Sequence, residues 1–344
     1  MDGDTLERQL SESLRPPFLS PMQEAKNIWF NGSLVPWKDA NIHVLSHAMH
    51  YGSGAFEGMR AYDINGQAAI VGLEAHVQRL FDSCRVLYMD LPFSPHQVAE
   101  AIKGTIQSNG HTACYIRPIA YRGYAELRVS PEACPVELAI ATYPWGAYHG
   151  SEGLEQGVDV GVSSWRRMAP DTHPAMAKVT GNYVNSMLVV MEAKRHGYAE
   201  GIVLDTAGYV SEGSGENLFF VKDGVVLTPA LGDSILPGIT RAYVIQLCKE
   251  LGLPVNETRI VREMMYNADE MFMTGTAAEI TPVRSVDHHT IGEGKPGPIT
   301  RRLQEEFFGI LKGQKEDRHE WLTFVDSAPS GDARAVGAGS GSEG

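Results

Sequence analysis

The sequence predicts an α+β protein of two domains, built on antiparallel or mixed sheets with surrounding helices. Its 344 residues suggest two domains, because a domain commonly takes roughly 150 residues. Strand-like and helical segments do not alternate strictly, which argues against a doubly wound parallel sheet. Two tight-turn signals, Asn31-Gly32 and Asn65-Gly66, each follow a strand-like run and indicate antiparallel pairing at the start of the fold.

A smaller α/β domain is expected over residues 25–148. After the strands around the two Asn-Gly turns, residues 73–88 have helical periodicity. Ser94 and Pro95 are a typical N-cap and first-turn pair, and they predict a second helix. The runs ACYIRPIAY and VELAIATY then predict two further strands.

A larger domain is expected over residues 158–325, after an interdomain loop at 149–157 that is polar and rich in glycine. Two helices are predicted in it, at 184–196 and 239–251, because a glycine follows each apolar-faced stretch. The segments GIVLD, GYVSE, NLFFV and VVLTP between these helices are short and separated by turns, so they predict strands.

The two ends of the chain have compositions that do not favour a packed core. We expect residues 1–24 to be a flexible segment and residues 326–344, which run through SAPSGDARAVGAGSGSEG, to be a disordered tail.

The charge and the cysteines exclude several classes of function. Twenty-nine Lys and Arg against 42 Asp and Glu give a formal net charge of −13, which repels nucleic acid and anionic membrane surfaces. No apolar run approaches the roughly 18 residues of a membrane span. The four cysteines are scattered without a CxxC spacing, so neither a disulfide framework nor a zinc site is indicated. These features predict a cytoplasmic protein.

Two motifs that could suggest other chemistry do not hold. YGSGAFEG has three glycines, but the third stands one residue too late for a dinucleotide fingerprint, and a strand-like run follows it. His43, His47 and His50 have a spacing that a metal could use, but no fourth ligand supports them. We therefore interpret them as a structural histidine cluster and expect no metal.

Lys178 stands apart from the other lysines. Residues 174–191 contain no other charged side chain, and poor solvation favours the neutral amine that attacks an aldehyde. A lysine that extends to solvent from a strand end would look similar. The choice between the two interpretations depends on whether the other parts of a covalent cofactor site are present.

A pyridoxal phosphate site needs an acid for the pyridine nitrogen, a donor to the phenolic oxygen and a phosphate cradle. Glu212 is a candidate for the acid and Tyr183 for the donor to the phenolic oxygen. From the sequence alone, Glu212 could equally be a glutamate in a surface turn, and Tyr183 could be an aromatic residue of the core. Ile239 and Thr240 begin a predicted helix, whose free amides attract phosphate. The turn Gly275-Thr276-Ala277 could direct further amides and a hydroxyl at an anion.

Four segments strengthen this interpretation: KVTGNYVNSMLVVMEAKRHGY, GYVSEGSGENLF, LPGITR and MFMTGTAAEITPVRSVD. They resemble the class IV, fold-type IV pyridoxal phosphate aminotransferases, and more narrowly the branched-chain amino acid aminotransferases, over about residues 28–321. The resemblance implies that Lys178 forms the internal aldimine and moves the proton between substrate Cα and cofactor. It also implies that Glu212 pairs with the pyridine nitrogen and Tyr183 with the phenolic oxygen, and that the larger domain binds the cofactor.

The resemblance also implies how the phosphate and the substrates are bound. The phosphate residues would be Arg79, Ile239, Thr240 and Thr276, with Leu236 packed against the ring. The aliphatic side-chain pocket would be Phe56, Trp145 and Tyr148, with Tyr51 from the partner subunit. The α-carboxylate would meet Tyr115, Thr276 and Ala277, and the distal carboxylate of glutamate would meet Arg117.

The implied reaction is reversible amino transfer between L-leucine, L-isoleucine or L-valine and 2-oxoglutarate, in a homodimer with shared active sites that could assemble further. A D-amino acid transaminase, an aminodeoxychorismate lyase and a non-catalytic cofactor-binding protein remain alternatives. One position departs from the family: Arg128 stands where a glycine is usual, between Leu127 and Val129. Its guanidinium could lean toward the partner's pocket or point to solvent.

Overall fold

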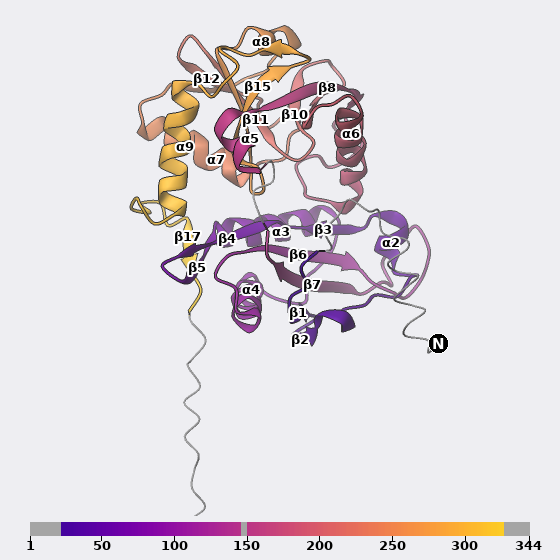
Figure 1. The fold of residues 1–344 in the computed structure, drawn as a ribbon. Helices are drawn as coiled ribbons and strands as arrows, with labels where there is room; N and C mark the ends of the chain where they lie inside the picture. Colours follow the sequence, from indigo (N-terminus) through magenta and orange to yellow (C-terminus); the bar gives the residue numbers. More distant parts are fainter. Residues whose placement is uncertain (1–21, 146–149, 327–344) are drawn as a thin grey trace, which may run out of the picture.

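The computed structural model describes residues 22–145 and 150–326. Residues 1–21, 146–149 and 327–344 lie outside the described residues, and with them most of the two predicted flexible ends. The described chain forms two layered halves, each built on its own sheet, with the earlier residues below and the later ones above in Figure 1.

The sheet of the first half is antiparallel throughout its described pairs, in the order β17-β5-β4-β6-β7-β1-β2 with β3 beside β6. Its strands are β1 (Asn27–Phe30), β2 (Ser33–Pro36), β3 (Gly54–Phe56), β4 (Met59–Ile64), β5 (Gln67–Val71), β6 (Cys114–Arg122), β7 (Val136–Tyr143) and β17 (Leu322–Phe324). Its helical segments are η1 (Trp37–Asp39), α2 (His47–Tyr51), α3 (Leu73–Val86) and α4 (Pro95–Asn109).

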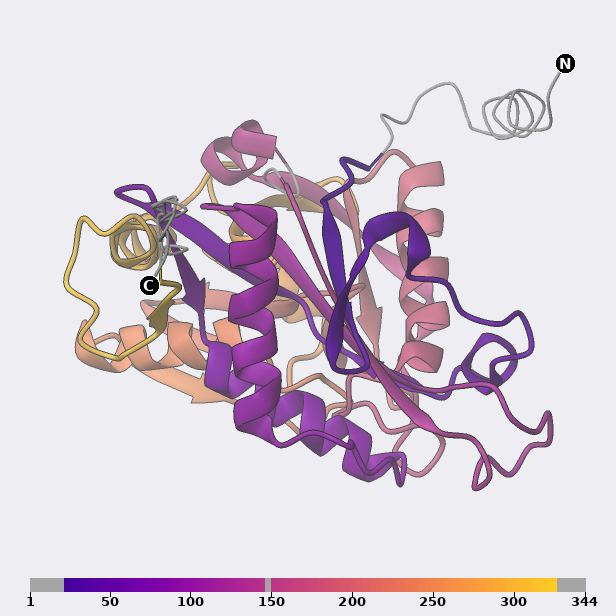
Figure 2. The same ribbon diagram turned by 90° about the horizontal axis from the view of Figure 1, so that it is seen from below.

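Helices α3 and α4 form where the sequence predicts them. Ser94 caps α4 through the amide of Gln97, while the Gln97 side chain accepts from the Ser94 amide, so two free donors are satisfied at once. Leu80 of α3 and Ile102 of α4 are fully buried in one core with the sheet. Figure 2 shows α4 lying across the face of this sheet.

The sheet of the second half is mixed, with parallel pairs between β8 and β9, β8 and β15, and β12 and β13. Its strands are β8 (Val158–Arg166), β9 (Glu200–Leu204), β10 (Val210–Gly213), β11 (Asn217–Lys222), β12 (Val225–Thr228), β13 (Val255–Glu257), β14 (Glu270–Gly275), β15 (Glu279–Val286) and β16 (His289–Thr290). Its helical segments are α5 (Gly150–Gln156), η2 (Thr180–Asn182), α6 (Tyr183–Arg195), α7 (Ile239–Glu250), α8 (Arg262–Tyr266) and α9 (Pro298–Leu311).

Strand β11 separates two hydrophobic cores in this half. Phe219 and Val221 face the core that holds α7 and α9, whereas Leu218 and Phe220 face the opposite core. The alternation follows from the two-residue period of a strand, and because both faces are covered the strand is apolar nearly throughout. The two sheets, one antiparallel and one mixed, confirm the predicted α+β class.

Two details of the predicted organisation are wrong. Residues 150–156 of the expected loop form helix α5. The glycines at positions 150 and 157 have positive φ, so they mark the two ends of this helix and do not interrupt it. Leu322 of β17, expected with the second half, pairs with Val71 in the first sheet. This pairing covers the otherwise open edge of β5.

The segment that carries Lys178 crosses the junction between the halves. The amide of Phe56 in β3 donates to the carbonyl of Lys178 at 3.0 Å, and the amide of Lys178 donates to Ser83 Oγ of α3 at 2.9 Å. The first sheet and α3 therefore fix the backbone from which the lysine extends.

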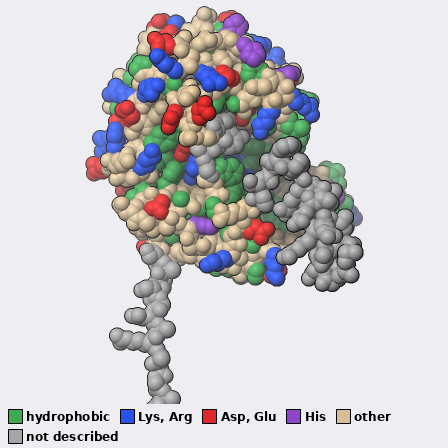
Figure 3. Space-filling model, viewed as in Figure 1, with side chains coloured by type: hydrophobic (Ala, Val, Ile, Leu, Met, Phe, Trp, Pro, Cys, Tyr) green, Lys and Arg blue, Asp and Glu red, His purple; other side chains and the backbone are tan. Residues whose placement is uncertain are grey.

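On the face shown in Figure 3, acidic and basic side chains are interspersed over the second half. Among the described residues, no helix is long and apolar enough to cross a membrane.

Candidate active site

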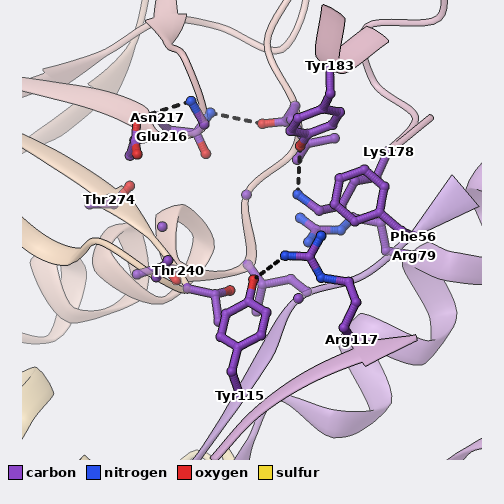
Figure 4. A pocket seen from close by; sticks show the side chains of 18 of the residues that line it. Phe56, Arg79, Tyr115, Arg117, Lys178, Tyr183, Glu216, Asn217, Thr240 and Thr274 are labelled. Carbon is purple, nitrogen blue, oxygen red and sulfur yellow. Dashed lines mark hydrogen bonds between the residues drawn. The ribbon is translucent and has the colours of Figure 1, made fainter. Parts of the chain in front are cut away.

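A cavity of about 210 Å³ lies between the two halves and brings most of the predicted site residues together. Both halves contribute side chains to its wall (Figure 4). The predicted residues that line it are Phe56, Arg79, Tyr115, Arg117, Trp145, Lys178, Tyr183, Leu236, Ile239, Thr240, Thr276 and Ala277. Residues more than 200 positions apart in the sequence thus meet at one site.

Lys178 and Tyr183 lie side by side in the wall of this cavity. A short 3-10 turn after Val179 leads into α6, which begins at Tyr183. The Lys178 Nζ donates to the Tyr183 hydroxyl at 2.8 Å and lies 5.1 Å from the centre of the Phe56 ring. The amine therefore points into the cavity rather than to bulk solvent, which excludes the interpretation of a lysine that only extends to solvent.

The wall near α7 has the features of an anion cradle. Helix α7 follows Gly238, and no side chain caps its first turn, so its amides are free to bind a ligand. A Cβ at Gly238 would lie 1.9 Å from Asn217 Oδ1, so only glycine fits there. Nearby, Thr274 Oγ1 is buried without a hydrogen-bond partner in the part of the chain that the structure describes. Together with Arg79 and the turn at Thr276, this wall suits a phosphate group.

Glu212 is not itself a lining residue of the cavity, but it bonds two residues that are. One carboxylate oxygen accepts from Asn217 Nδ2 at 3.2 Å and from the Leu236 amide at 2.9 Å, and both of these residues line the cavity. Its other oxygen accepts from Arg167, which the sequence did not single out. Burial raises the pKa of Glu212, and Arg167 opposes that rise. The pair is buried, with side chains 4% and 6% exposed.

A second carboxyl group, Glu216, reaches the wall directly. Burial, and then the nearby Glu200, raise the pKa of Glu216 well above its usual range. No arginine pairs with Glu216 among the described residues, in contrast to Glu212. The environment therefore favours an ionised Glu212 and a protonated Glu216.

The opposite wall is aromatic and carries one guanidinium. Arg117 extends from β6 with its charged carbon 4.8 Å from the centre of the Phe56 ring and 5.2 Å from that of Tyr115. Its Nη2 donates to the Tyr115 hydroxyl at 3.3 Å, while its buried Nε has no partner among the described residues. The Trp145 ring lies 4.7 Å from that of Tyr115. This wall is therefore aromatic, and the guanidinium of Arg117 is its one donor group with a buried N–H left unsatisfied among the described residues.

Two other described positions, Tyr51 and Arg128, do not line this cavity. Tyr51, expected to serve a partner subunit, is 46% exposed on α2. Tyr148 lies outside the described residues. The Arg128 side chain is 77% exposed and its Nε lies 3.3 Å from Glu126.

The three clustered histidines have structural contacts. His47 bonds Ser53 and the carbonyl of Arg128, His50 bonds the carbonyl of Val44, and His43 stacks on a tyrosine ring. The described residues contain no group of three or more His, Cys, Asp or Glu arranged to hold a metal.

Comparison with known proteins defines the class. The family model described as amino-transferase class IV matches residues 54–286, so the chain belongs to that family. The branched-chain-amino-acid aminotransferase of Escherichia coli (strain K12) is 51% identical over 305 residues, covering 88% of this chain and 99% of that protein. The protein of the same name from Pseudomonas aeruginosa is 45% identical over 298 residues, covering 87% and 97%.

Solved structures agree with the sequence comparisons. The crystal structure of the Escherichia coli branched-chain amino acid aminotransferase superposes with a TM-score of 0.87 at 51% identity, covering 88% of this chain and 100% of that one. The branched-chain amino acid aminotransferase of Thermobaculum terrenum, in its PLP-bound holo form, gives 0.83 at 34% identity, covering 88% and 99%. These similarities confirm the predicted fold-type IV architecture, the transaminase class and the pyridoxal phosphate cofactor.

Proposed function

We propose that this protein reversibly transfers the amino group of L-leucine, L-isoleucine or L-valine to 2-oxoglutarate. The observation that carries the proposal is the content of one cavity: an amine beside a phenol, an anion cradle, and a guanidinium set in an aromatic wall. Relatives at 45–51% identity, named branched-chain-amino-acid aminotransferases, support the same assignment.

The residues present fit pyridoxal phosphate. Arg79, Ile239, Thr240 and Thr276 would hold its phosphate, because free helix amides and a guanidinium favour a dianion. Leu236 would pack against its ring. When bound, the cofactor supplies an electron sink that stabilises negative charge at the substrate Cα.

Three groups of the chain would handle charge and protons during the reaction. Lys178, fixed at its backbone by Ser83 and β3, would take the proton from the substrate Cα and return it. Tyr183 would hydrogen-bond the phenolic oxygen of the cofactor, as its hydroxyl already bonds the lysine. Glu212 would keep the pyridine nitrogen protonated, because a carboxylate favours the cationic form of its partner.

One pocket must accept both an aliphatic and an acidic side chain. Phe56, Trp145 and Tyr148 would enclose the branched side chain, and Arg117 would bind the distal carboxylate of glutamate. The α-carboxylate would meet Tyr115, Thr276 and Ala277. With an aliphatic substrate bound, the Arg117 charge would still lie against two aromatic rings, which stabilise a cation.

We further propose a homodimer with shared active sites. Helix α2 and the 123–129 segment pack together through a 2.8 Å bond from His47 to the carbonyl of Arg128. Exposed apolar side chains gather on these two segments and just before α2: Val44, Met49, Tyr51, Tyr124, Leu127 and Val129. A patch of this kind is typical of a protein interface, and Tyr51 and Val129 would then complete the partner's pocket.

A cytoplasmic location is also proposed. All four cysteines are buried and none forms a disulfide, as is usual in a reducing compartment.

The experiment is a transamination assay of purified protein with pyridoxal phosphate, 2-oxoglutarate and each enantiomer of leucine. We expect glutamate formation with L-leucine, none with D-leucine, and none with Lys178→Ala, which keeps the cavity but lacks the amine. Activity with D-leucine alone would identify a D-amino acid transaminase. Cofactor absorbance without turnover would identify a binding protein.

A further inference from the structure

A buried carboxylate that the sequence did not single out lies behind the predicted phosphate arginine. Glu57, the residue after β3, has no exposed surface. Its Oε1 accepts from Arg79 Nε at 2.6 Å and its Oε2 accepts from Arg79 Nη2 at 2.9 Å. Two parallel bonds of this kind fix both the position and the plane of a guanidinium.

His76 makes a further hydrogen bond to the Glu57 carboxylate. The Nδ1 of His76, one helical turn before Arg79 in α3, lies 2.7 Å from Glu57 Oε2. Burial lowers the pKa of His76, so the neutral ring donates its Nδ1 hydrogen to the carboxylate. Burial alone would raise the pKa of Glu57, but Arg79 and His76 outweigh it and lower that pKa. Glu57 is therefore an ionised acceptor with a fixed orientation.

The remaining donors of Arg79 follow from this arrangement. A guanidinium has five N–H donors. Within the described residues three are used, by the two bonds to Glu57 and by a 2.9 Å bond from Nη1 to the carbonyl of Pro237, so five minus three leaves two. These two lie on the terminal nitrogens, on the side away from Glu57. Arg79 lines the cavity beside Gly238, which begins the α7 cradle.

We propose that Glu57 is a positioning residue for the cofactor phosphate: it holds the guanidinium of Arg79 so that its two free donors face the α7 cradle. The proposal rests on the proposed function, which assigns Arg79 to the phosphate. Because Glu57 also cancels the charge of Arg79, the arginine acts as an oriented donor more than as a net positive charge. The orientation of the Arg79 donors therefore matters more for phosphate binding than the net charge of Arg79. Loss of Glu57 weakens phosphate binding for that reason.

The test compares pyridoxal phosphate with pyridoxal, which lacks the phosphate, in absorbance titrations of the full-length protein. Glu57→Gln is expected to weaken pyridoxal phosphate binding on the order of tenfold and pyridoxal binding by less than about twofold. Glu57→Asp keeps the charge but shortens the reach, and it is expected to show the same selective loss if the glutamine variant does not fold. The phosphorus NMR signal of the bound cofactor is expected to shift in both variants.

Glu270→Gln is the matched control, because Glu270 is a buried carboxylate that bonds the first amides of α9 and does not line the cavity. It should lower thermal stability and leave both affinities unchanged. Arg79→Met separates the two proposals. If Arg79→Met spares the preference for pyridoxal phosphate, the phosphate assignment fails; if it removes the preference while both Glu57 variants keep it, only the role of Glu57 is overturned. In the Arg79→Met background, Glu57→Gln should cause no further loss.

Discussion

The buried ion pair between Arg167 and Glu212 gives a pH-dependent prediction. Arg167 also donates to Asn185 Oδ1 at 3.1 Å and Ser186 Oγ at 3.3 Å, so α6 holds its guanidinium in place. Besides Arg167, the charges that act on Glu212 come from Lys178, and Glu212 in turn acts on Glu216. Arg167→Met keeps much of the side-chain volume and removes the dominant positive partner.

The magnitude follows from the geometry of the pair. Two unit charges about 4 Å apart interact by about 4 kcal/mol at an effective dielectric constant of about 20. That energy corresponds to a pKa shift of about 3 units. The pKa of Glu212 is already raised by burial, so without Arg167 it rises further and the protonated form of the carboxyl is favoured. In the proposed function the ionised form supports the pyridine nitrogen, so we expect activity to fall in this variant and to return as the pH rises.

The assay measures kcat and kcat/KM from about pH 5 to pH 10. For Arg167→Met the acid limb should move to higher pH by about 2 to 3 units. Arg167→Lys, which keeps the charge, should move it much less. Because a broken buried pair costs about 3 to 5 kcal/mol of stability, Tm is measured alongside. The double variant Arg167→Met/Glu212→Gln should regain part of that stability without regaining activity. A uniform loss of rate with an unmoved pH profile would refute the electrostatic role.

Three further predictions concern individual side chains. Glu212→Gln should bind cofactor but lose most turnover, whereas Glu216→Gln, which mimics an already protonated acid, should keep most of it; the reverse order of rates would assign the pyridine nitrogen to Glu216. Arg117→Leu should weaken 2-oxoglutarate and glutamate about a hundredfold, or about 3 kcal/mol, and leucine far less, so equal losses in the two half-reactions would make it structural. Arg128→Gly should leave KM for 2-oxoglutarate and its salt dependence unchanged, because an exposed pair with Glu126 is screened; a raised KM with a flattened salt response would show that Arg128 reaches the partner's site.

Sequence reasoning located the parts of the site that depend on local structure. The separation of Lys178 from Tyr183 is set by one short turn, and the free amides of α7 follow from a glycine before a helix. Glu57 and Arg167 were missed because charged residues at the ends of strands usually face solvent. Arg167 meets Glu212 45 positions away, and Glu57 meets Arg79 22 positions away. Only the packed halves show that these charges are buried and paired.

The buried charges around the cavity divide into those that are matched within the protein and those that are free for ligands. Arg79 is matched by Glu57 and Arg167 by Glu212, while burial raises the pKa of both Glu216 and Glu200 and so opposes the ionisation of that pair. Among the described residues that line the cavity, Lys178 and Arg117 have no carboxylate partner in the protein. Burying an unpaired charge is costly, so the guanidinium of Arg117 is stabilised chiefly by what binds. In the proposed function, the distal carboxylate of a dicarboxylic substrate supplies the missing charge. Arg117 must also lie beside aliphatic substrates, and its contacts with two aromatic rings stabilise the cation when no carboxylate is bound. Lys178 instead donates a hydrogen bond to the Tyr183 hydroxyl.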